Sequence, residues 1–335
     1  MPVNDRSTDA TRAIIDAYVG LYPDRIVPFH RDAGRPGKAA ALRDAAGSVQ
    51  SEVLVVFDAD YIPSKGLIRQ LVAPFFDPEI GAVMGRVVPL NANRSLLTKL
   101  LDIERSGGYQ VDQQARMTLK LVPQYGGTTG GVRMSALRAV GGWADDVLAE
   151  DTELTFRLLL QGWKTAYQNR AECYEEVPES WGTRSRQIGR WAMGHNQTLA
   201  RHIRGVLSSR RLRGIEKIDG LLLLCIYLMP VLTLTAFLLI TLLFYLGQPL
   251  PFDWLLLGLG VFLYGSLGNF AAFFELAAGC YLDGKRSNAR LLPLVLLSFI
   301  VSLVAVIRIT LRQVFIDSLF RRELVWHKTA RYRTP

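Results

Sequence analysis

The longest apolar pattern lies in the C-terminal part of the chain. Between Asp219 and Leu282 there is no Lys or Arg, and this length exceeds the roughly 20 residues that a helix needs to cross a bilayer. Pro230 lies inside the stretch and predicts a kink. The sequence therefore indicates a multi-pass membrane protein. Membrane-spanning helices are predicted over three segments, about 220–246, 254–281 and 291–311.

The first 183 residues mix apolar and polar positions in the way of a soluble domain. Residues 2–4 are typical of the end of a strand and 5–9 of a polar turn, while the apolar positions of 10–18 recur at helical spacing. A strand, a turn and a helix form half of a βαβ unit. The segment EVLVVFDAD, residues 52–60, is typical of a short apolar strand that runs into carboxylates. We therefore expect an α/β domain over residues 1–183.

Positive charge accumulates beside the apolar segments. Residues 184–217 contain nine Lys or Arg and one Glu, and residues 283–335 contain ten Lys or Arg and three acidic residues. Such a distribution suits anionic lipid at a cytoplasmic face, and no recognisable nucleic-acid module accompanies it. We therefore expect the α/β domain on the cytoplasmic side of the cell membrane, interfacial helices over 184–218, a basic tail over 312–335, and no nucleic-acid partner.

The side of the membrane on which the basic tail lies stays open at this point. The loop QPLPFD, residues 248–253, has no positive charge and should face away from the cytoplasm. The third segment has 17 uncharged residues before Arg308, which at helical rise is about 25 Å, short of the roughly 30 Å hydrocarbon core. If the segment crosses, the tail lies outside, against the positive-inside tendency. The alternatives are that the segment lies in the interface or that a further crossing exists.

The strand of residues 53–57 leads directly into Asp58 and Asp60. On extended backbone, residues two apart point the same way, so both carboxylates can face one hard cation. Mg²⁺ or Mn²⁺ prefers oxygen ligands and commonly bridges a carboxylate to phosphate oxygens. An ordinary acidic turn after a strand is the alternative, because D-x-D alone is a weak motif.

Two further motifs carry candidate chemistry. Glu150 and Asp151 begin a strong helical pattern, where a carboxylate can serve as a general base or simply complement the helix dipole. In the segment RSRQIGRWAMGH, Gln187, Arg190 and Trp191 share one helical face. Arg can hold phosphate, Gln can bond hydroxyl groups and a Trp face can stack on a sugar. The alternative is a packed Trp beside an Arg at the lipid surface.

The order of these motifs, followed by apolar segments, resembles the processive family-2 glycosyltransferases, which include cellulose, chitin, hyaluronan and mannan synthases. Further similar segments are VNDRSTDAT, GRPGKAAAL, YGGTTGGVRMSALRAVGGW, CYEEVPESW and VWHKTAR. The resemblance covers almost the whole chain. It implies a GT-A-type, Rossmann-like catalytic domain over 1–183, followed by an α-helical transmembrane region over 219–311.

The resemblance also implies residue roles on the donor side. Asp5 matches the aspartate that contacts the nucleotide base, and Lys38 stands where a basic residue lies near the diphosphate. Asp58 matches the donor-binding aspartate, which we also expect to help hold the metal, and Asp60 matches the metal ligand of D-x-D. Arg190 belongs to the motif that holds the donor diphosphate. The implied cofactor is Mg²⁺ or Mn²⁺, and the implied donor is a nucleotide sugar, with a UDP-sugar favoured over a GDP-sugar.

On the acceptor side, Asp151 matches the catalytic base, with Glu150 beside it, and Gln187 and Trp191 match the motif that holds the terminal sugar of a glycan acceptor. One departure is Ala149, where the family often has Thr or Ser. The resemblance implies a membrane-bound inverting transferase that extends a β-linked polysaccharide. The alternatives are transfer of a single sugar to a lipid carrier and an inactive subunit.

The family's catalytic fold starts with a strand and a helix before the V-N-D-x-S turn, whereas that turn opens this sequence. We therefore expect the catalytic domain to lack its N-terminal start here, with Met1 internal to a longer protein. The alternative is a real fragment, which should be unstable or inactive. An edge of the first strand would then be unpaired.

Overall fold

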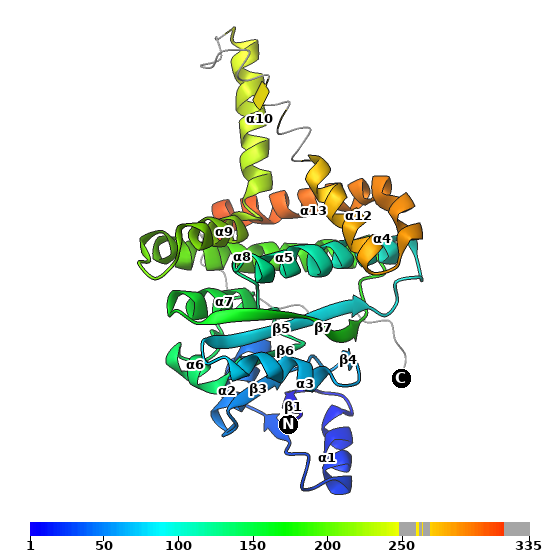
Figure 1. Cartoon of the computed structure of the whole chain (residues 1–335), viewed down its shortest axis with the longest axis vertical. Helices are drawn as coiled ribbons and strands as arrows, with labels where there is room; N and C mark the ends of the chain where they lie inside the picture. Colours follow the sequence, from blue (N-terminus) through cyan, green and yellow to red (C-terminus); the bar gives the residue numbers. More distant parts are fainter. Residues whose placement is uncertain (248–258, 261–262, 264–268, 318–335) are drawn as a thin grey trace.

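The computed structural model describes residues 1–247, 259–260, 263 and 269–317. Figure 1 shows a sheet in the middle of the molecule, with a layer of long helices on one side and shorter helices on the other. Most of residues 254–268, which belong to the second predicted span, lie outside the described residues. Residues 318–335 of the predicted basic tail also lie outside them.

The central sheet has five strands in the order β3-β6-β5-β7-β4. Only β5 and β7 run parallel, and the other neighbours are antiparallel. The predicted α/β architecture is therefore present with a mixed sheet. The strands are β3 (Val53–Val56), β4 (Ile62–Pro63), β5 (Ile80–Pro89), β6 (Gly130–Arg133) and β7 (Lys164–Glu175).

The N-terminal segment forms a second, separate sheet of two parallel strands, β1 (Val3–Asp5) and β2 (Phe29–Arg31). Helix α1 (Thr11–Leu21) connects them, and α2 (Lys38–Gly47) follows. The predicted strand, polar turn and helix at the start of the chain are confirmed, with the helix beginning at Thr11.

Buried apolar side chains fill the space between the sheet and its helices. One cluster contains Trp143, Tyr125, Leu154 and Leu158 from the loops and helix on one face, and it fixes α7 against the sheet. The helices and helical turns of this region are α3 (Leu67–Val72), η1 (Ala73–Phe76), α4 (Leu96–Gly107), η2 (Gly108–Gln113), α5 (Gln114–Thr118), α6 (Met134–Ala139) and α7 (Glu150–Leu160).

The long-helix layer begins with α8 (Trp181–Ser208) and α9 (Gly214–Cys225). The span predicted over 220–246 covers the end of α9 and all of α10 (Met229–Tyr245), and these two helices are bent by 76° at a short break. Pro230 lies in the first turn of α10, where a missing N–H costs no hydrogen bond. The predicted kink is therefore a helix boundary.

The remaining described helices are α12 (Asn269–Leu282), η4 (Arg286–Leu291), α13 (Leu292–Arg312) and η5 (Gln313–Asp317). By length and composition alone, the described part of the chain holds one helix that could cross a membrane, Arg286–Phe315, or two if the bent pair of α9 and α10 counts as one span. Figure 1 shows α10 rising along the long axis of the molecule, whereas α13 runs across it beside α8.

Polar side chains connect α13 and the residues after it to α4 and α8. The Ser298 hydroxyl donates to Glu104 of α4, and the Asn196 amide of α8 donates to the Thr310 hydroxyl at 3.0 Å and to Gln313 Oε1 at 3.1 Å. The hydrocarbon of a bilayer cannot supply such hydrogen-bond partners, so an apolar helix surrounded by lipid would not form these contacts. These contacts seat α13 on α4 and α8.

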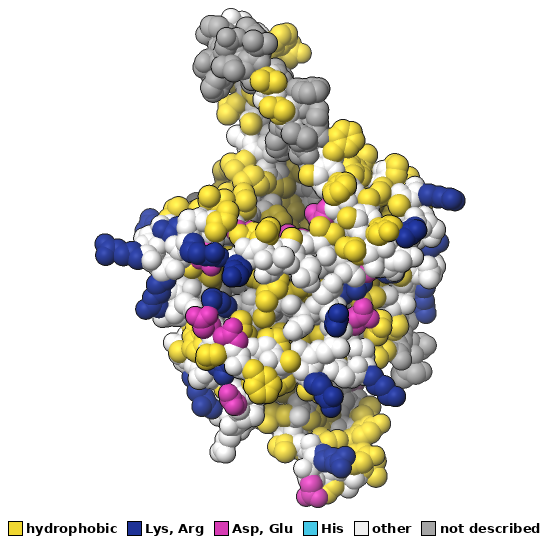
Figure 2. Space-filling model, viewed as in Figure 1, with side chains coloured by type: hydrophobic (Ala, Val, Ile, Leu, Met, Phe, Trp, Pro, Cys, Tyr) yellow, Lys and Arg dark blue, Asp and Glu magenta, His cyan; other side chains and the backbone are white. Residues whose placement is uncertain are grey.

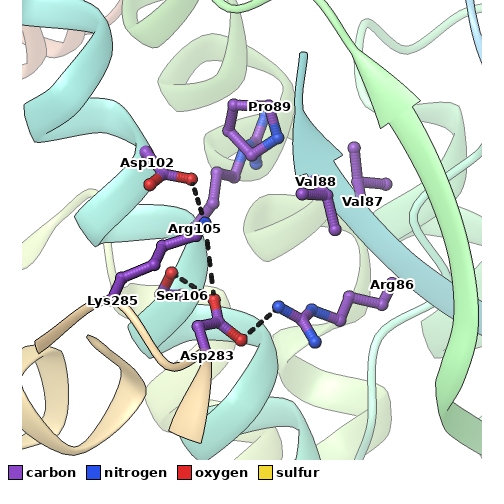
Figure 3. A pocket seen from close by; sticks show the side chains of 9 residues that line it. All are labelled: Arg86, Val87, Val88, Pro89, Asp102, Arg105, Ser106, Asp283 and Lys285. Atoms are coloured by element: carbon purple, nitrogen blue, oxygen red, sulfur yellow. Dashed lines mark hydrogen bonds and ion pairs between the residues drawn. The ribbon is translucent and has the colours of Figure 1, made fainter. Parts of the chain in front are cut away.

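The loop after α12 is also anchored to the sheet. Figure 3 shows the Asp283 carboxylate turned toward Arg86 of β5 and Ser106 of α4. Ser106 Oγ donates to Asp283 at 2.5 Å, and Lys285 Nζ lies 2.7 Å from the Asp102 carboxylate. The Asp283 side chain is 3 % exposed, so its charge requires these partners. The helical layer and the sheet are therefore joined by buried ion pairs.

Candidate active site

Three segments that lie far apart in the sequence meet at one lysine. Lys38 Nζ, at the first residue of α2, lies 2.8 Å from Asp58 Oδ1 and 3.6 Å from Glu150 Oε1. Asp58 follows β3, and Glu150 is the first residue of α7. The structure therefore brings together three of the residues that the sequence assigns to donor binding and catalysis.

Burial and charge shift the pKa values in this cluster. Burial raises the pKa of Glu150 to about 6, with Lys38 opposing and the neighbouring Asp151 carboxylate adding to the rise. Burial alone would lower the pKa of Lys38, but the Glu150 and Asp58 carboxylates outweigh it and raise that pKa. Lys38 therefore stays charged and partly neutralises the carboxylates.

Asp151 lies beside the glycine-rich segment. Its Oδ1 accepts the Thr152 N–H at 2.7 Å. A Cβ at Gly127 would lie 3.0 Å from the Asp151 Cβ, and Gly127 has φ +71°, which favours glycine. Within the segment YGGTTGG, Gly127 therefore allows close approach to the candidate base.

The D-x-D segment differs from its predicted geometry. The strand ends at Val56, and the Tyr61 N–H donates to the Asp58 carbonyl at 3.1 Å, which closes a turn. The expectation of extended backbone from Asp58 to Asp60 is therefore wrong. Asp58 faces Lys38, and its N–H donates to the Thr128 hydroxyl at 3.0 Å, whereas Asp60 is exposed in the turn.

Asp5 is held in the N-terminal sheet. Its Oδ1 lies 2.7 Å from Arg31 Nη1, and its Oδ2 accepts the Gly37 N–H at 2.9 Å. Burial would raise the pKa of Asp5, but the Gly37 amide, Arg6 and Arg31 outweigh it and lower that pKa. Asp5 thereby fixes the residue next to Lys38.

The α8 motif residues have different surroundings. Gln187 is buried and its Oε1 accepts from Arg184 Nη1 at 3.0 Å. Trp191 is partly buried and packs against apolar residues of α8 and α13, and Arg190 is partly exposed. Gly194, three residues after Trp191, allows α8 to approach the start of α7 closely, since a Cβ at Gly194 would lie 2.6 Å from the Ala149 Cβ.

Several residues near this site are not among the candidates that the sequence motifs give. Arg105 of α4 lies over the Trp191 ring and 2.6 Å from Glu175 Oε1. His195 Nε2 lies 3.2 Å from the Thr152 hydroxyl, next to Asp151. The segment CYEEVPESW pointed to the region of Glu175, but nothing in the sequence pairs it with an arginine 70 positions earlier.

The carboxylates fit a divalent cation only in part. Within the described residues, no three His, Cys, Asp or Glu side chains form a metal cage. The hydroxyl of buried Tyr125 has no hydrogen-bond partner there, and burial together with Asp151, Glu150 and Asp58 raises its pKa. Mg²⁺ usually takes one or two carboxylates and completes its shell with water and phosphate oxygens. The residues present therefore fit a cation that arrives with a phosphorylated donor.

The chain therefore combines a mixed α/β sheet with a lysine and carboxylates that meet at the ends of its elements. The family model described as Glycosyl transferase family group 2 matches residues 53–271. The chain belongs to this family and is a family 2 glycosyltransferase.

Relatives of known name agree with this family. "Probable glycosyltransferase YdaM" of Bacillus subtilis (strain 168) is 27 % identical over 337 residues, which cover 98 % of this chain and 78 % of that protein. "Probable glucomannan 4-beta-mannosyltransferase 1" of Arabidopsis thaliana is 29 % identical over 199 residues, 57 % of this chain and 36 % of that protein. The match thus spans about a third of the plant protein.

Among solved structures, the mannosyltransferase PcManGT from Pyrobaculum calidifontis, in complex with GDP-Man and Mn2+, is similar to this chain with a TM-score of 0.57. The similarity covers 93 % of this chain and 76 % of that one at 18 % identity. At this identity the likeness concerns the fold, which is the GT-A-like fold expected from the sequence.

Proposed function

We propose that this protein is a membrane-bound, inverting glycosyltransferase that moves a sugar from a nucleotide-sugar donor to a growing β-linked glycan. The observation that carries the proposal is the meeting of Lys38, Asp58 and Glu150 beside Asp151. A single lysine among carboxylates suits a donor that brings both phosphate charge and a divalent cation.

In this proposal the chain's residues divide the work. Lys38 and Arg190 offset the charge that builds on the departing nucleoside diphosphate. Asp58 and Asp60 would hold Mg²⁺ or Mn²⁺, which supplies further charge stabilisation on the diphosphate when bound. Asp151 accepts the proton of the acceptor hydroxyl, whose oxygen then attacks the anomeric carbon directly. A single displacement inverts the configuration at that carbon.

In this proposal α8 binds the acceptor. Trp191 would stack on the terminal sugar, and Gln187, whose Oε1 accepts from Arg184, would orient that sugar. Asp5 would bind the nucleotide base from the N-terminal sheet. Since named relatives include mannosyltransferases, and one solved relative holds GDP-Man, GDP-mannose is the first donor to test, ahead of the UDP-sugars.

We also propose that α10 enters the bilayer while α9 lies at its surface. No residue of α10 is buried in the protein, and Figure 2 shows hydrophobic side chains gathered there, with Lys and Arg around the level of α8 and α9. The exposed Ile215, Ile218 and Leu222 lie on one face of α9. Because α13 runs across α10 and bonds to α8, we place α13 at the interface, the alternative that the sequence left open.

The test is donor turnover by membranes that contain the chain. Release of nucleotide from GDP-mannose, UDP-glucose or UDP-N-acetylglucosamine is measured with Mn²⁺, and the labelled product is separated into lipid-soluble and polymeric fractions. We expect release from one donor, abolished in Asp151→Asn and retained in the exposed control Asp32→Asn. Label in lipid alone would favour transfer to a lipid carrier, and no release from any donor would reject the enzymatic proposal.

A further inference from the structure

Trp191 has two arginines at its ring. Arg105 Cζ lies 5.6 Å from the ring centroid and Arg184 Cζ lies 5.5 Å from it. The two guanidiniums come from different helices, α4 and α8. Guanidinium groups at this distance are attracted by the ring, more strongly where water is excluded. The orientation of Trp191 is therefore determined by more than apolar packing.

A carboxylate holds each of these arginines. Arg105 Nη2 lies 2.6 Å from Glu175 Oε1, and Arg184 Nη2 lies 2.5 Å from Glu104 Oε2. The Glu175 side chain is only 4 % exposed. A buried pair of this kind is often no more stabilising than apolar residues of equal volume, but it fixes the direction of both groups. Packing of α4 alone would not require Arg105.

Glu175 also reaches the donor side of the site. Its Oε2 accepts a hydrogen bond from the Tyr61 hydroxyl. Tyr61 follows Asp60 and closes the D-x-D turn through the Asp58 carbonyl. Direct contacts therefore run from the turn at Asp58 through Tyr61 and Glu175 to Arg105, and from there to Trp191.

We propose that Arg105 is a positioning residue that holds the Trp191 ring in place for the acceptor. Through Glu175 and Tyr61, Arg105 also fixes the position of that ring relative to the D-x-D turn. This inference rests on the proposed function, in which Trp191 contacts the acceptor sugar. Arg105 itself touches neither reacting group. Loss of the Arg105 guanidinium should leave donor binding intact. The acceptor would then be misplaced, and water would compete with it for the donor sugar.

The experiment replaces Arg105 with Met, which approximates the unbranched stem of the arginine side chain and removes the guanidinium. GDP-[¹⁴C]mannose, or whichever donor gives release that depends on Asp151, is supplied to membranes. Free labelled sugar reports hydrolysis, and label in any larger product reports transfer. We expect Arg105→Met to lower transfer by about 30-fold, the size of a desolvated cation–π contact. The donor KM should stay unchanged while the share of free sugar rises.

Three further variants separate positioning from folding. Arg94→Met removes an exposed arginine from a 3.4 Å pair with Glu179 and should change neither quantity. Arg105→Lys keeps the charge and should restore part of the transfer. Tyr61→Phe cuts only the bond to Glu175 and should raise the share of free sugar in the same direction as Arg105→Met.

Combination with Trp191→Leu completes the test. If Arg105 acts through Trp191, the double variant should be no worse than Trp191→Leu alone. Additive losses, an unchanged ratio of hydrolysis to transfer, or a raised donor KM would each overturn the inference. Should Arg105→Met fail to fold, Arg105→Lys and Tyr61→Phe decide the question in the same assay. A wild-type chain with no Asp151-dependent release would instead reject the proposed function itself, before any variant is compared.

Discussion

The close contact between α8 and the start of α7 gives the sharpest prediction. At Gly194 an added Cβ would lie 2.6 Å from both the Cβ and the N of Ala149 and 3.0 Å from the Leu148 carbonyl carbon. Carbon atoms in ordinary contact are about 3.5–4.0 Å apart. Gly194→Ala therefore requires α8 and the loop to separate by roughly 1 Å, since part of the obstacle is backbone.

This displacement should affect activity more than stability. Ala149 directly precedes Glu150 and Asp151, and misplacement by about 1 Å can cost on the order of 100-fold in rate. Overpacking costs about 1–3 kcal/mol, but Ala in place of Gly inside a helix returns about 0.5–1 kcal/mol. We expect kcat for nucleotide release to fall by about 100-fold while the free energy of unfolding falls by no more than about 2 kcal/mol.

Gly189 offers a matched control on the same helix. A Cβ there would meet nothing nearer than Ile309 Cγ1 at 3.9 Å, an ordinary contact. Gly189→Ala should therefore keep full activity and gain slightly in stability. Nucleotide release and thermal unfolding in detergent are measured for both variants. Full activity in Gly194→Ala, or an equal loss in both, would refute the argument from close approach.

Three further changes test the surroundings of the site. Glu153 is 1 % exposed and accepts from Arg157 at 2.7–2.8 Å, so Glu153→Gln should lower the free energy of unfolding by about 3–5 kcal/mol, seen in chemical denaturation. Because the pKa of Glu150 is raised from 4.5 to about 6, the folded chain without donor keeps a proton that the unfolded chain loses. Its stability should fall by about 2 kcal/mol as the pH rises through that interval, and Glu150→Gln, followed by the same denaturation series, should lack the fall. Gly127→Ala places a Cβ against Asp151 and should lower kcat by about 100-fold or more, whereas an unchanged kcat would show that the base lies elsewhere.

Local pattern was enough to place the best-defined part of the site. Acidic residues at the start of an apolar-periodic segment predict a helix N-terminus, and Glu150 and Asp151 do begin α7. The spacing of Gln187 and Trp191 predicted a helix, and both lie on α8. These predictions hold because helix starts and helical faces are decided by residues a few positions apart.

Features that depend on distant residues were not accessible in this way. The chain turns at Ala59 and Asp60, and Asp58, two residues before Asp60, contacts Lys38 and the Thr128 hydroxyl, which lie 20 and 70 positions away in the sequence. The pairing of Arg105 with Glu175 joins positions that no periodicity relates. Pro230 predicts where the apolar run bends, but the run does not reveal how large the bend is, which is 76° between α9 and α10.

The first turn of α7 itself argues for the identity of the base. It carries three carboxylates, Glu150, Asp151 and Glu153, all favoured by the positive end of the helix dipole. Glu153 is bound by Arg157 and His202, and Glu150 faces Lys38. Among the residues that the structure describes, Asp151 alone of the three forms no ion pair, and its Oδ2 lies over the open face of a glycine. A base must keep an oxygen for the acceptor's proton, and the lack of an ion pair at Asp151 supports the role of base that we propose for it.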